Sequence, residues 1–125
     1  MIDEYRRGWA MRYLREAKAE LTAAQKMPYT APNLILEAVR KAQAAIYHSL
    51  GAPAFIEKAV REASEKKEAT NDPVLKCLLD IQKMVKQLTQ LEDVDEEKTM
   101  KQVDNLIQLA SEIVQVFTGA KPEED

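Results

Sequence analysis

Apolar residues recur along this chain every three or four positions, the spacing that places them on one face of an α-helix. Prolines, glycines and short polar stretches divide the chain into five such segments. The pattern predicts five helices, at Asp3–Lys26, from Thr30 to Leu50, from Pro53 to about Ala63, from Pro73 to about Leu91, and across residues 100–117.

Each predicted helix has one apolar face, which we expect to lie against the core. The face of the second helix is rich in small residues, so another helix can approach it closely. The five faces are Ala10, Leu14, Ala17, Leu21 and Ala24; Ile35, Ala38, Val39, Ala42, Ile46 and Ser49; Phe55, Ile56, Ala59, Val60 and Ala63; Val74, Leu78, Ile81, Val85 and Leu88; and Met100, Val103, Ile107, Ala110, Val114 and Phe117.

Residues with the chemistry of helix ends punctuate these segments. Thr30 is a predicted cap for the second helix, and Gly51 predicts its end. Asp72 followed by Pro73 is typical of a helix start, because aspartate caps free N–H groups and proline fits the first turn. Gly119 predicts the end of the last helix.

Composition agrees with helices throughout. The chain has 125 residues with only 3 glycines and 5 prolines, and good helix formers such as alanine, leucine and glutamate dominate. We predict an all-α fold, a four- to five-helix up-and-down bundle. Residues 1–119 should form a single domain and residues 120–125 a flexible acidic tail. The short turn at residues 92–95 predicts an antiparallel hairpin of the last two helices.

The single cysteine, Cys77, excludes an internal disulfide. With no signal-peptide pattern at the start of the sequence, we expect a cytoplasmic protein. No apolar run approaches the roughly 18 residues of a membrane span, so we expect no membrane partner. The net charge is −3, yet residues 1–50 carry eight Lys/Arg against five Asp/Glu.

The sequence offers little from which to build a catalytic, metal or cofactor site. His48 is the only histidine, and Ser49 beside it diverges by about 100° on a helix, so the two do not face each other. Glycines are isolated and form no phosphate loop. We therefore expect no enzyme activity, no metal and no cofactor, and a buried structural role for Cys77.

Basic residues in the first two helices are the candidate nucleic-acid-binding positions. Arginines can contact phosphates, although Glu16 can neutralise Arg12 and the pI of about 5.3 is low for a nucleic-acid binder. Arg40 and His48 lie about 80° apart around one helix and about 12 Å apart along it, so they can border one groove without touching. The candidates are Arg6, Arg12, Arg15, Arg40 and His48.

Three stretches carry a family resemblance: Arg-Tyr-Leu-Arg-Glu-Ala-Lys at 12–18, Ala-Val-Arg-Lys-Ala-Gln-Ala-Ala at 38–45, and Leu-Gly-Ala-Pro at 50–53. Together they resemble the first two helices of HEPN-type helical domains of archaea and bacteria. The resemblance implies a helical bundle that pairs into dimers and contacts nucleotides or RNA. Members that cut RNA have a closer arginine–histidine spacing in another helix; here seven residues separate Arg40 from His48, which argues against a ribonuclease.

Two functions follow as expectations. The first is a non-catalytic helical-bundle module for interaction or assembly, a homodimer or the partner of another protein, because broad apolar faces leave surplus apolar surface. The alternative is a HEPN-like module that binds nucleotides or RNA.

Overall fold

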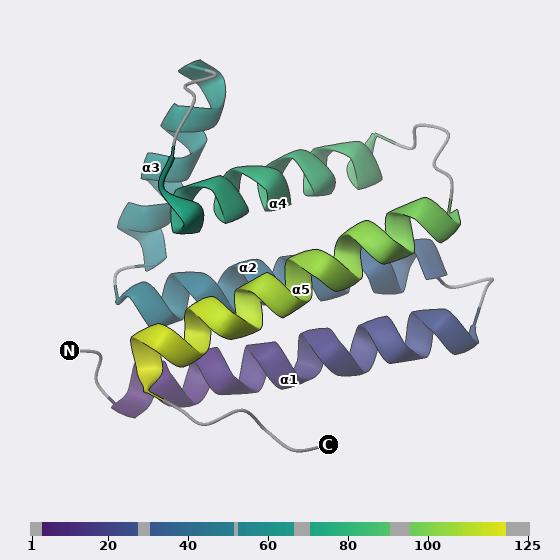
Figure 1. The fold of residues 1–125 in the computed structure, drawn as a ribbon, viewed down its shortest axis with the longest axis horizontal. Helices are drawn as coiled ribbons and strands as arrows, with labels where there is room; N and C mark the ends of the chain where they lie inside the picture. The colour runs from purple at the N-terminus through teal and green to yellow at the C-terminus, as the bar shows by residue number, and fades with distance from the viewer. Residues whose placement is uncertain (1–3, 28–30, 52, 67–70, 91–95, 120–125) are drawn as a thin grey trace.

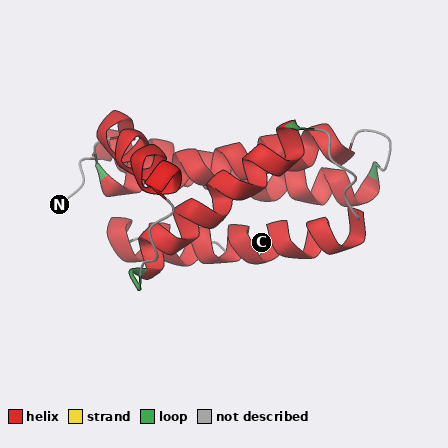
Figure 2. Cartoon of the chain, turned by 90° about the horizontal axis from the view of Figure 1, so that it is seen from above, coloured by secondary structure: helices red, strands yellow, loops and turns green. Residues whose placement is uncertain are grey.

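The computed structural model describes residues 4–27, 31–51, 53–66, 71–90 and 96–119. These residues form five helices, α1 (Glu4–Lys26), α2 (Ala31–Leu50), α3 (Pro53–Lys66), α4 (Pro73–Thr89) and α5 (Glu96–Thr118). No strand occurs in the described ranges (Figure 2). The predicted all-α fold is confirmed.

Four of the helices form an up-and-down bundle, and one does not join it. Helices α1, α2, α4 and α5 run in alternating directions, whereas α3 projects from the end of α2 and crosses the start of α4 (Figure 1). The predicted four- to five-helix bundle is therefore four long helices with a crosswise fifth. None of the described helices combines the length and the apolar character needed to cross a membrane.

The helix ends follow from local side-chain chemistry. Asp72 caps α4, since its Oδ1 accepts hydrogen bonds from the backbone N–H of Val74 at 2.9 Å and of Leu75 at 3.3 Å. Gly51 and Gly119 take positive φ angles of 103° and 68° just after α2 and α5, a conformation that favours glycine. The predicted cap Thr30, the turn at 92–95 and the tail at 120–125 lie outside the described residues.

The pairing of α1 with α2 is the most extensive contact between helices. Both helices bury small side chains on the shared core, which lets their backbones lie close together. α5 packs on α2 and α1, and its contact with α4 is smaller, although these two helices are antiparallel as predicted (Figure 1). The alanines of α1 and α2 that are at most 2% exposed are Ala10, Ala17, Ala24, Ala38, Ala42 and Ala45.

The predicted inner face of α3 is wrong in part. Phe55 is 70% exposed and Ala59 is also exposed, whereas Val60 is 2% exposed. The reason is the crosswise position of α3, which contacts only α2 and α4 and does so over a short length. Phe117 was also predicted in the core, from α5, but it is 44% exposed. It lies in the last turn of its helix.

Close packing at Ala17 leads to a stability prediction. Ala17→Leu should lower the free energy of unfolding by about 1–3 kcal/mol, because a filled core must distort to accept the added methylenes. Ala19→Leu is the matched control, since Ala19 is exposed on the same helix and should change stability by less than about 0.5 kcal/mol. Urea denaturation followed by circular dichroism measures both. Equal effects of the two variants would contradict the packing described here.

Candidate functional site

The antiparallel pairing of α1 and α2 brings His48, near the end of α2, beside the first turns of α1. We call this contact the α1–α2 seam and define it by Tyr5, Trp9, Arg12, Tyr13 and His48. Trp9 and Tyr13 lie one turn apart on α1, so their rings point to the same side. The i, i+4, i+8 spacing of Tyr5, Trp9 and Tyr13 puts them on one side of α1. The contact of Trp9 and Tyr13 with His48 depends on the helix pairing.

The rings of the seam form a chain of neighbouring ring contacts, which we call the stack. The ring centroid of His48 lies 5.4 Å from that of Tyr13 and 6.5 Å from that of Trp9, both in stacked geometry. Trp9 lies 5.6 Å from Tyr13, and Tyr5 meets Trp9 edge-on at 6.3 Å. Such pairs contribute about 0.5–1.5 kcal/mol each beyond the area they bury. The stack therefore has a structural role in joining α1 to α2.

Arg12 lies at the solvent side of this stack. Its guanidinium carbon is 5.1 Å from the centroid of the Trp9 ring, and its Nε is 3.2 Å from Oε1 of Glu16. The side chain is 59% exposed, so the ion pair contributes little to stability. The hydrogen bond from Arg12, followed by the charge of Lys41, lowers the pKa of Glu16 despite some burial.

The surroundings of His48 favour its neutral form. Burial, and then the positive charge of Arg6, lower the pKa of His48 below its ordinary value of 6.5. Its Nδ1 is buried and makes no hydrogen bond with any described residue. A neutral imidazole cannot pair with a phosphate by charge, so His48 fits a stacking partner better than an anion ligand.

An ionic cluster continues the contact between α1 and α2 farther along. Lys41 donates to Glu20 and lies 3.5 Å from Oε2 of Glu16. These partners raise the pKa of Lys41, the hydrogen bond to Glu20 having the largest effect. Arg12 also pairs with Glu16, so the cluster has two cations and two carboxylates and its charges balance within the protein.

The predicted basic residues do not form one surface. Arg6 lies within electrostatic reach of His48 and Arg12 lies on Trp9, whereas Arg15 is exposed on α1. Arg40 lines a groove of about 720 Å³ with residues of α3 and α4, and no residue of α1 lines that groove. Arg40 and His48 thus face different neighbours.

The groove contains cations that sequence reasoning missed. Arg61 of α3 and both Lys83 and Lys86 of α4 line it together with Arg40. The signal available in the sequence was the i, i+3 spacing of Lys83 and Lys86 away from the apolar stripe of α4. That signal does not disclose which helix lies opposite, and the crosswise position of α3 was not predicted.

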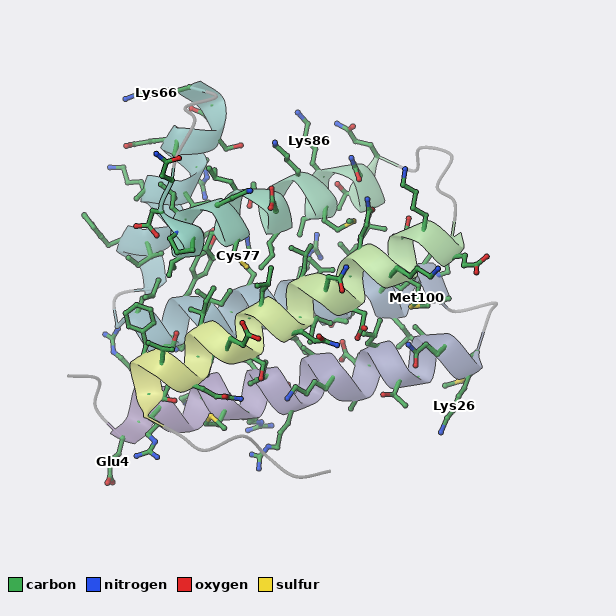
Figure 3. All side chains as sticks on the ribbon, viewed as in Figure 1. Glu4, Lys26, Lys66, Cys77, Lys86 and Met100 are labelled. Atoms are coloured by element: carbon green, nitrogen blue, oxygen red, sulfur yellow. The ribbon has the colours of Figure 1, made fainter. Side chains whose placement is uncertain are left out.

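Cys77 has the buried position expected of it. Figure 3 shows its side chain on the side of α4 that faces the bundle, while Lys86 extends from the opposite side. Burial, followed by the charge of Asp80, raises the pKa of the Cys77 thiol to about 11, so it is protonated and unreactive at neutral pH. Within the described ranges, no cluster of three or more histidine, cysteine or acidic residues has the geometry of a metal site.

Comparisons with protein-family models, with curated proteins and with solved structures found no match to this chain.

The state of His48 can be measured directly, because it is the only histidine of the chain. An NMR titration of its ring protons should give a pKa below 6.5 in the folded protein. The unfolded chain takes up a proton near that pH while the folded protein resists it, so stability should decline as the pH falls below about 6.5. His48→Phe keeps an aromatic ring in the stack and should lose this part of the pH dependence. A pKa at or above 6.5 would contradict the assigned environment.

Proposed function

We propose that this chain is a non-catalytic helical interaction module that works as a homodimer, with α5 at the contact between the two copies. The observation that supports this most directly is a second apolar edge on α5. Leu109 is 46% exposed and Val116 is 78% exposed, and the half-buried Ile113 lies between them. The three residues are spaced by four and three positions, so they share one side of the helix.

This edge is additional to the buried face of α5. The core face already uses Val103, Ile107, Ala110 and Val114, each at most 2% exposed. A helix with apolar residues on two sides usually packs on two neighbours, and a second copy of the chain offers the same edge by symmetry. A net charge of only −3 opposes such pairing weakly. The single, buried cysteine suits a reducing compartment, and we place the module in the cytoplasm.

Val116→Glu tests the homodimer. The wild-type chain should have the mass of a dimer in light scattering, and the variant should shift to monomer, because a carboxylate in an apolar contact must lose its water. Val116 is largely exposed in one chain, so the monomer should keep its fold. Gln108→Glu is the control, since it adds the same charge at an exposed position elsewhere on α5. A wild-type chain that is monomeric at high concentration would reject the proposal.

A second candidate is a module that binds RNA or a nucleotide at the α1–α2 seam. Tyr5 is 73% exposed at the edge of Trp9, and Arg12 lies on that ring from the solvent side. An exposed aromatic ring beside arginines is a surface on which unpaired bases stack. The resemblance to HEPN-type domains points the same way, although the arginine–histidine spacing of their ribonucleases is missing.

Single-stranded RNA of mixed sequence tests this candidate. Binding at low salt should weaken as salt rises, and replacing Arg12 and Arg15 by alanine should weaken it and reduce its salt dependence, because phosphate contacts are lost. Tyr5→Ala should cost about 1–3 kcal/mol if a base stacks on its ring. Lys101→Ala, an exposed position on α5, is the control. Absence of RNA binding at low salt would exclude the seam as a nucleic-acid site.

A further inference from the structure

The groove between α2, α3 and α4 gathers positive charge from three helices. We call it the basic groove and define it by Arg40 of α2, Arg61 of α3, and Lys83, Gln82 and Lys86 of α4. It exists because α3 crosses the start of α4 instead of lying along the bundle (Figure 1). Four cationic side chains and one carboxylate, that of Glu65, line its volume of about 720 Å³.

Three of these four cations lack, within the described ranges, the ion-pair partners that other basic residues of the protein have. Arg40, Lys83 and Lys86 form no ion pair with any residue that the structure describes. Arg61 lies 3.3 Å from Glu57, but both side chains are more than half exposed, at 61% and 57%. By contrast, Lys41 has two carboxylate partners. The groove therefore has three cations without ion-pair partners among the described residues against the one carboxylate of Glu65, and this excess of positive charge attracts an anion from solution.

The groove lining contains polar and apolar side chains beside the cations. Gln82 accepts a hydrogen bond of 3.1 Å from Gln43, which ties α4 to α2 next to the groove. Leu79 and Val85 supply apolar lining on either side of Gln82. A concave site with low-dielectric walls concentrates the field of the charges at its mouth, so attraction for an anion is stronger than on a flat surface.

We propose that the basic groove binds a small anion with adjacent phosphate groups, such as inorganic triphosphate or a nucleoside triphosphate. The number and spread of the cations favour a multivalent anion, because a single carboxylate cannot reach side chains from three helices. Two of the four are arginines, whose planar fork matches phosphate oxygens, and lysine binds phosphate as a point charge. The volume falls within the roughly 300–1,000 Å³ of small-ligand sites. The inference does not depend on self-association or on the seam.

Calorimetric titration with sodium triphosphate and with ATP tests the groove. Both should bind the wild-type chain at low salt, with weaker binding at high salt because the charges are screened. Replacing Lys83 and Lys86 by glutamine should reduce affinity about tenfold or more, since hydrogen bonds to charged groups are lost. Arg40→Gln should reduce it as well. Lys76→Gln is the matched control, because Lys76 is exposed on α4 but does not line the groove.

Further titrations separate the sources of phosphate and the competing explanations. AMP should bind more weakly than ATP, because it has one phosphate group. Binding of a short RNA with a terminal triphosphate should require Lys83 and Lys86. Binding of the same RNA with a terminal hydroxyl should not require them. Circular dichroism should give the same unfolding midpoint for all variants, as expected for exposed positions. The proposal fails if triphosphate does not bind at low salt. It also fails if Lys76→Gln weakens binding as much as the loss of Lys83 and Lys86 does, or if those two lysines matter equally for binding of the hydroxyl-ended and the triphosphate-ended RNA.

Discussion

Close packing of α1 against α2 is the constraint on which the rest of this structure depends. Alanines on both helices are buried almost completely, including Ala17 on α1 and Ala42 on α2. Small side chains let two helix backbones approach, but they bury little apolar area by themselves. Larger residues such as Leu14 and Ile46 complete the core, and α5 covers the pair. The position of α5 is therefore set by a helix pair that is already closely packed.

The same pairing determines the chemistry of the α1–α2 seam. In a pair of antiparallel helices, residues closer to the N-terminus of one helix lie beside residues closer to the C-terminus of the other. His48 consequently meets Trp9 and Tyr13, and Lys41, two turns earlier on α2, meets Glu16 and Glu20 on α1. One contact is aromatic and the other ionic, although Nδ1 of His48 and Oε2 of Glu20 are buried without a hydrogen bond to any described residue.

Local chemistry was sufficient to predict the helices and several of their ends. Asp72, Gly51 and Gly119 act through their own backbone and near neighbours, so their roles could be inferred without knowing the fold. The orientation of α3 could not be inferred this way, because Phe55 has the same helical spacing whether it faces a neighbour or solvent. Only the area offered by α2 and α4 decides which residues of α3 become buried.

For the candidate sites too, helix geometry was predictable from the sequence, whereas contacts between helices were not. The angle between Arg40 and His48 on α2 follows from helix geometry alone, and it correctly indicates that the two do not touch. The neighbour that each of them faces depends on tertiary packing. His48 packs against Tyr13 of α1, whereas Arg40 lies beside α3 and α4. Arg61 was not predicted as a site residue, because a lone arginine among glutamates and lysines is typical of a solvated helix face.

The crosswise position of α3 links the fold to the basic groove. A fifth helix packed along the bundle would turn its apolar face to α2 and α4 and cover the surface beside Arg40. In this protein α3 buries Val60 and leaves Phe55 exposed, so less apolar area is buried there. The same orientation leaves the basic groove open between α2, α3 and α4. An anion that binds the cations of this groove only in the folded chain would stabilise the fold by mass action. The departure from a regular bundle is therefore the feature of this fold that is most directly suited to binding.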